Sequence, residues 1–108
     1  MNKIKFETRK EVYIRAGQVN GFDAQMIVAL EELSEVQKEV CKVLRGKGSL
    51  AHLAEEIADA TIMLEQLRLF YGLNTDVCHQ MDVKVARLAH NLGIHLEEED
   101  ESNEMDSC

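Results

Sequence analysis

Residues 23–48 read DAQMIVALEELSEVQKEVCKVLRGKG, and this stretch is the strongest indication of the fold in the sequence. Its apolar side chains recur every three or four residues and would form one stripe on a helix, made of Met26, Leu30, Leu33, Val36, Val40, Val43 and Leu44. Asp23 is a candidate N-cap, and Arg45 before Gly46 supplies a cationic last turn followed by a glycine that ends helices. We therefore predict a helix over 24–45 that buries this stripe.

Glycines divide the rest of the chain into three further helical segments. The sequence has no proline and is rich in Ala, Leu, Glu, Lys, Gln and Met, which favours helices throughout. We expect the additional helices at 7–16, ending at Gly17; at 50–71, after the N-cap candidate Ser49; and at 74–91. The predicted fold class is all-α, a four-helix bundle whose second and third helices form a central antiparallel hairpin.

The second half of the third predicted helix is apolar on almost every side. Residues 61–71 read TIMLEQLRLFY, which exposes more apolar surface than one neighbouring helix can cover. A second subunit would cover the excess, so we expect a homo-oligomer, either a dimer or a tetramer. The alternative is that the first and fourth helices are sufficient.

The negative charge is concentrated at the C-terminal end. The chain carries 12 Lys+Arg against 20 Asp+Glu, a formal net charge of -8. Residues 97–108 hold seven of these acids and no base, whereas residues 1–96 hold 13 acids and 12 bases. We predict one domain over 1–96 and an acidic, disordered tail over 97–108, with docking to a basic partner as the alternative role of the tail. The nearly neutral body argues against binding to nucleic-acid polymers.

Two further features bear on location. No apolar run approaches the ~18 residues of a membrane span, and the first residues, MNKIKFE, contain no apolar signal-peptide segment. We therefore expect a cytoplasmic protein without membrane contact. The three cysteines, Cys41, Cys78 and Cys108, are widely spaced and form no CxxC pair, so we expect reduced thiols.

Two acidic motifs lie in the central helices, EExxE in the second and EExxD in the third. Side chains three residues apart share a helix face, about 5–6 Å apart at Cβ, so Glu32 pairs with Glu35 and Glu56 pairs with Asp59. Counted from the centre of the hairpin turn, the two pairs differ in height by only about 4.5 Å. Four carboxylates would then meet at one level and repel one another unless a cation neutralises them. Oxygen ligands favour Mg²⁺, with Mn²⁺ as a second possibility; the alternative is that these acids are ordinary solvated surface groups.

These motifs, with the flanking segments LEELSEVQK and LAEEIADATIML, resemble the EExxE…ExxD signature of the MazG-like all-α nucleoside triphosphate pyrophosphohydrolases. That family includes the dimeric dUTPases and dCTP pyrophosphatases, and the resemblance covers roughly residues 24–92. It implies Mg²⁺-dependent hydrolysis of a nucleoside triphosphate to the monophosphate and pyrophosphate, in nucleotide-pool house-cleaning. Glu32, Glu35, Glu56 and Asp59 occupy the metal-ligand positions of the family. Glu35 is the preferred candidate to orient or deprotonate the attacking water, and Glu32 is the second candidate.

A triphosphate also needs cations. The resemblance places Lys84 and Arg87, which are i,i+3 neighbours, near the triphosphate. Lys38 and Lys42 on the second helix are further candidates, although any of these cations can equally be a surface charge. His52, one turn before Glu56, is a candidate to contact the carboxylates from outside.

Three functions stay open at this stage. The first is the pyrophosphohydrolase. The second is a non-enzymatic helical interaction module with an acidic docking tail. The third is a member of the same family that binds nucleotides with feeble turnover.

Overall fold

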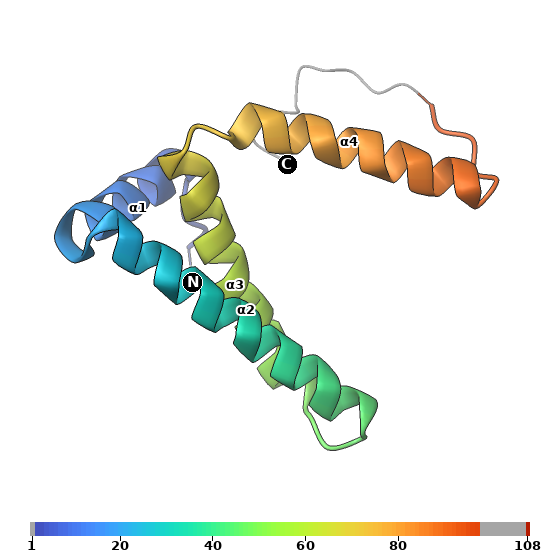
Figure 1. The fold of residues 1–108 in the computed structure, drawn as a ribbon, viewed down its shortest axis with the longest axis horizontal. Coiled ribbons are helices and arrows are strands. Elements are labelled where there is room, and N and C mark those ends of the chain that lie inside the picture. The colour runs from blue at the N-terminus through green and yellow to red at the C-terminus, as the bar shows by residue number, and fades with distance from the viewer. Residues whose placement is uncertain (1, 98–107) are drawn as a thin grey trace. The chain divides into compact units, whose positions relative to one another are not determined.

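The computed structural model describes residues 2–97 and 108 of the 108-residue chain. These residues form four helices and no strand: α1 (Phe6–Asn20), α2 (Phe22–Leu44), α3 (Leu50–Phe70) and α4 (Asn74–Asn91) (Figure 1). The all-α class with four helices is therefore confirmed. The chain divides into two compact units, Met1–Tyr71 and Gly72–Cys108. Most of the predicted acidic tail, residues 98–107, lies outside the described residues.

The first unit is a three-helix assembly in which α2 and α3 lie side by side and run in opposite directions (Figure 1). Helix α1 packs against both. Polar side chains link the three helices: buried Gln25 Nε2 donates to Gln66 Oε1 at 2.8 Å, and half-buried Arg9 Nη1 donates to Glu65 Oε1 at 3.0 Å. The buried hydroxyl of Tyr13 also donates to Glu65.

Helix α1 runs through Gly17, where we had predicted its end. A Cβ at Gly17 would lie 2.4 Å from Cε1 of Phe22, so the glycine makes room for the Phe22 ring. That ring packs edge-on against Phe70, with 4.8 Å between the ring centroids. The chain breaks four residues later at Gly21, whose φ of 96° lies in the region that favours glycine. Gly21 also takes the N-cap position of α2 that we had assigned to Asp23.

The other predicted boundaries agree closely with the structure. Ser49 is the N-cap of α3, and its Oγ accepts a hydrogen bond of 3.0 Å from the backbone N–H of His52. This bond satisfies one of the backbone donors that a helix start leaves without a partner. Helix α3 ends one residue earlier than predicted, and α4 spans the predicted 74–91.

The buried face of α2 is rotated by about one residue from the predicted apolar stripe. Gln25, Ala29 and Glu39 are the buried residues of this helix, whereas Leu30 is 68% exposed and Leu44 is 81% exposed. The prediction that the stripe is buried within the chain is therefore wrong for most of its members. The small Ala29 and the side chains that follow it at helical spacing face inward, and the larger apolar side chains face outward.

In the second unit, a disulfide joins Cys78 of α4 to Cys108, with 5.4 Å between their Cα atoms. The expectation that all three cysteines are reduced is therefore wrong for these two, and Cys41 is a free, exposed thiol. The pair is 30 residues apart in the sequence, so local cysteine spacing carried no sign of it. None of the helices in the described part of the chain is both long and apolar enough to cross a membrane.

Candidate metal centre

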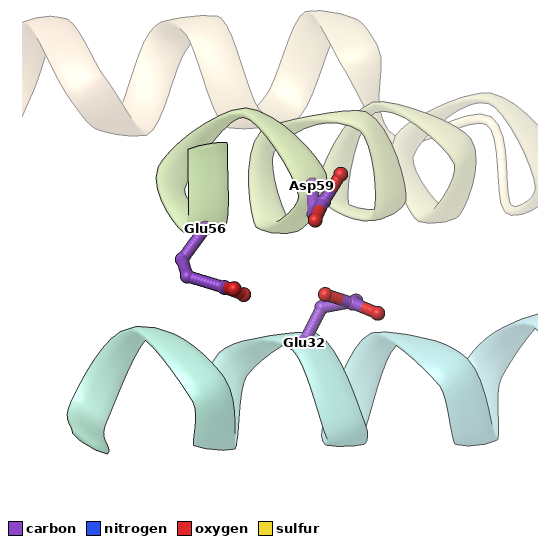
Figure 2. Close-up of side chains that lie close together, drawn as sticks. All are labelled: Glu32, Glu56 and Asp59. Carbon is purple, nitrogen blue, oxygen red and sulfur yellow. The ribbon is translucent and has the colours of Figure 1, made fainter. Parts of the chain in front are cut away.

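Three carboxylates from the two central helices of the first unit point toward one another. Glu32 comes from α2, and Glu56 and Asp59 come from α3 (Figure 2). One oxygen atom from each can be chosen so that all three atoms lie within 4.8 Å of one another. We refer to Glu32, Glu56 and Asp59 as the carboxylate triad.

Local sequence explains why the triad forms. Glu56 and Asp59 are three residues apart and therefore project from the same side of α3. Ala29, one turn before Glu32, and Ala60, next to Asp59, are both buried. Small side chains at such positions let two helices approach closely. The antiparallel course of α2 and α3 then brings Glu32 to the level of the α3 pair, as the residue count from the turn predicts.

The triad concentrates negative charge at a site that is half-buried. Burial raises the pKa of Glu32 above its ordinary value, and the negative charges of Asp59 and Glu56 raise it further, followed by those of Glu35 and Glu31. Asp59 is exposed, so one side of the triad is open to solvent. A cation that enters from this side would relieve the mutual repulsion of the three groups.

The donor set fits a small, hard divalent cation. All three donors are carboxylate oxygens, the ligand type that Mg²⁺ and Mn²⁺ prefer. Around an Mg²⁺ ion with oxygen ligands at about 2.1 Å, two ligands on opposite sides lie about 4.2 Å apart. Only one pair among three ligands can be opposite, and neighbouring ligands lie about 3.0 Å apart, so the triad oxygens, all within 4.8 Å of one another, would move closer together on binding. Three protein ligands also leave coordination positions for water or a phosphate oxygen.

Glu35, the fourth predicted ligand, does not join the triad. Its Oε1 lies 3.2 Å from Nζ of Lys38, and its side chain is 45% exposed. Lys38 is itself one of the predicted phosphate-binding residues, and here it forms an ordinary i,i+3 surface pair with Glu35. The structure thus brings together three of the four predicted ligands.

The remaining predicted cations have different surroundings. Lys42 lies 3.1 Å from Oε2 of Glu39, within the first unit. Lys84 and Arg87 are exposed on α4, which belongs to the other unit.

Sequence reasoning missed Glu39. It lies outside both acidic motifs and was not among the predicted site residues, yet its side chain is 4% exposed. Glu39 follows Glu32 by seven residues, two helical turns, so the two share the side of α2 that faces α3. Nε2 of His52 lies 3.6 Å from Glu39 Oε2 and 3.5 Å from Glu56 Oε1, which connects Glu39 to the triad. The seven-residue spacing was the signal that would have found it.

Comparisons with known proteins add no assignment. No family model, no curated protein and no solved structure matches this chain.

Proposed function

We propose that the protein is a Mg²⁺-dependent nucleoside triphosphate pyrophosphohydrolase of the MazG-like type, which converts an NTP or dNTP to the monophosphate and pyrophosphate. The observation that carries the proposal is the carboxylate triad, in which Glu32 meets Glu56 and Asp59 across two antiparallel helices. The motif resemblance supplies the reaction class, and a role in nucleotide-pool house-cleaning follows from it.

The triad would hold the metal, and Mn²⁺ would be accepted by the same oxygen donors. When bound, the ion supplies charge neutralisation on the phosphate oxygens and lowers the pKa of a coordinated water. Glu35 lies one turn beyond Glu32 on the same helix. By leaving Lys38 it would reach the site, either as a fourth ligand or to accept a proton from the attacking water.

Cationic side chains would hold the triphosphate. Lys38 is already paired with the motif carboxylate of Glu35, so an incoming phosphate would compete with Glu35 for it. Lys84 and Arg87, i,i+3 neighbours on α4, are proposed phosphate contacts because the family resemblance places cations at these positions. Their substitution tests that role independently of the metal ligands.

The proposed active form is a homo-oligomer. Met26, Leu30 and Leu33 on α2, together with Ile57 and Leu64 on α3, are exposed large apolar residues. Such a density of exposed apolar side chains is typical of a surface that a partner covers. We propose that a second copy of the chain covers it, and light scattering should report a mass above that of one 12.2 kDa chain.

The same exposed residues favour the second candidate function, a non-enzymatic helical interaction module. The enzyme proposal includes a cytoplasmic location. The Cys78–Cys108 disulfide argues against that location, because reducing compartments keep cysteines as free thiols.

The decisive experiment is a substrate panel. Pyrophosphate release is measured with Mg²⁺ across the common NTPs and dNTPs for the wild-type chain, Glu56→Gln, Asp59→Asn and the matched surface control Glu31→Gln. We expect turnover with at least one nucleotide, abolished in the two triad variants and retained in the control. Equal turnover in all four proteins would refute the role of the triad. If no nucleotide is hydrolysed, calorimetry with Mg²⁺ and a non-hydrolysable triphosphate separates a nucleotide-binding protein from an interaction module.

A further inference from the structure

The triad is connected to a second group of charged side chains toward the hairpin turn. His52 stands between two carboxylates, with Nε2 3.6 Å from Glu39 Oε2 and 3.5 Å from Glu56 Oε1. Its other ring nitrogen, Nδ1, lies 3.5 Å from Oε2 of Glu55, whose side chain is 76% exposed. Lys42 completes the group, with Nζ 3.1 Å from Glu39 Oε2.

Glu39 is the most deeply buried side chain of this group. A carboxylate with 4% exposure is costly to bury unless cationic or donor groups surround it. Among the described residues, Lys42 from the same helix and His52 from α3 lie next to the Glu39 carboxylate. The requirement to satisfy Glu39 therefore constrains the position of the His52 ring.

The backbone of His52 is constrained as well. Its N–H donates to Oγ of the N-cap Ser49 at 3.0 Å, which fixes His52 in the first turn of α3. Glu56 follows one turn later on the same side of the helix. With the backbone held by Ser49 and the ring held by Glu39, the imidazole presents Nε2 to one defined oxygen of Glu56.

From these contacts we infer that Glu39 and His52 act as positioning residues for the metal centre, with His52 holding the Glu56 carboxylate in the orientation that the triad requires. Glu56 is the member of the triad that this contact reaches, and its side chain is only 14% exposed. Without the ring, the carboxylate would regain rotamer freedom that metal binding must remove again. The inference rests on the proposed function only in that the triad binds a divalent ion.

Groups that contact and orient metal-ligating side chains without touching the metal typically contribute about 10- to 100-fold to metal affinity. We therefore expect His52→Ala to weaken Mn²⁺ binding by about tenfold or more. Glu39→Gln should weaken Mn²⁺ binding in the same direction, because a neutral amide attracts the His52 ring less strongly than a carboxylate does. The two effects should not multiply, since Glu39 acts on the metal through His52.

The test is calorimetric titration of Mn²⁺ into the full-length wild-type chain, His52→Ala, Glu39→Gln and the double variant. His52→Gln, which keeps an N–H donor, should recover a large part of the affinity. It is also the variant to measure if His52→Ala does not fold. Matched controls are Glu31→Gln and His79→Ala, both at exposed positions. The thermal midpoint of each metal-free variant is recorded, because a merely structural role would lower that midpoint without a specific loss of Mn²⁺ affinity.

The outcomes separate the two proposals. Less than a threefold loss of Mn²⁺ affinity in His52→Ala, with the wild type binding, overturns the inference and leaves the proposed function intact. A double variant that loses the product of the two single effects also overturns it, because the residues would then act independently. If the wild-type chain itself binds no Mn²⁺, the metal centre and this inference fall together.

Discussion

Without metal, the Asp59→Asn variant should be more stable than wild type. Once Mg²⁺ is added, the variant should be the less stable of the two proteins. Without an ion, the triad carboxylates repel one another across distances of up to 4.8 Å. Two unit charges at this distance repel by about 0.9 kcal/mol in water, and 0.15 M salt with a Debye length of about 8 Å reduces this to about 0.5 kcal/mol. Asp59 and Glu56 lie within this distance of each other, so the value is a lower limit for that pair, and relief at Glu32 acts in the same direction.

The expected change is measurable by thermal unfolding. For a domain of this size, 1 kcal/mol corresponds to about 4–8 °C in Tm, so metal-free Asp59→Asn should melt about 2–4 °C above wild type. With Mg²⁺ at 100 times its dissociation constant, wild type gains about 2.7 kcal/mol, and the variant, which has lost a charged ligand, gains far less. The order of the two Tm values should therefore reverse between EDTA and Mg²⁺.

Glu31→Gln provides the control for charge alone. It removes one negative charge from the same acidic region but leaves the triad intact, so its response to Mg²⁺ should match that of wild type. If Asp59→Asn melts below wild type in EDTA, the mutual repulsion inferred from the geometry is wrong. If Mg²⁺ stabilises both proteins equally, Asp59 is not a ligand.

Three further predictions concern the fold. Burial, followed by the hydrogen bond to Glu65, raises the pKa of Tyr13 above its ordinary 10.0, so the folded protein keeps this proton where the unfolded chain loses it. The free energy of unfolding should then fall by up to about 1.4 kcal/mol per pH unit above pH 10. Urea unfolding at a series of pH values should show a shallower fall of this free energy in Tyr13→Phe than in wild type. Gly17→Ala should destabilise by about 1 kcal/mol, because displacement of Phe22 outweighs the better helix propensity of alanine; in a Phe22→Ala background the same change should stabilise. Thiol titration should find one reactive cysteine, Cys41, in the native protein and three after reduction; three before reduction would contradict the disulfide.

Local signals in the sequence predicted most helix boundaries, and the exceptions have a clear cause. Ser49 was identified as an N-cap because capping depends only on neighbouring residues. Gly17 and Gly21 are both glycines near a helix end, and the sequence alone does not tell which one breaks the helix. Gly17 is explained by its contact with Phe22, and Gly21 by its positive φ.

The face of α2 shows a second limit of sequence reasoning. The periodicity of the apolar residues correctly indicated a helix, but the largest apolar side chains are not those that face α3. Ala29 is buried, whereas Leu30 is exposed, because close approach of two helices favours a small residue at the contact. The position of the buried face of α2 also limited the prediction of the site. Motif spacing predicted that Glu32 meets Glu56 and Asp59, but the burial of Glu39 depends on which side of α2 faces inward.

The two buried alanines beside the triad have a consequence for the choice between cations. Ala29 and Ala60 are buried next to carboxylates that come from opposite helices, so we expect the bulk at these two positions to influence how far apart those oxygens lie. Mg²⁺ requires oxygens at about 2.0–2.1 Å, whereas Ca²⁺ accepts about 2.3–2.6 Å and more ligands. If the triad holds an ion as proposed, a methyl group at each position would therefore favour the smaller cation. Enlarging either one would shift the preference of the site toward the larger ion before it abolished binding.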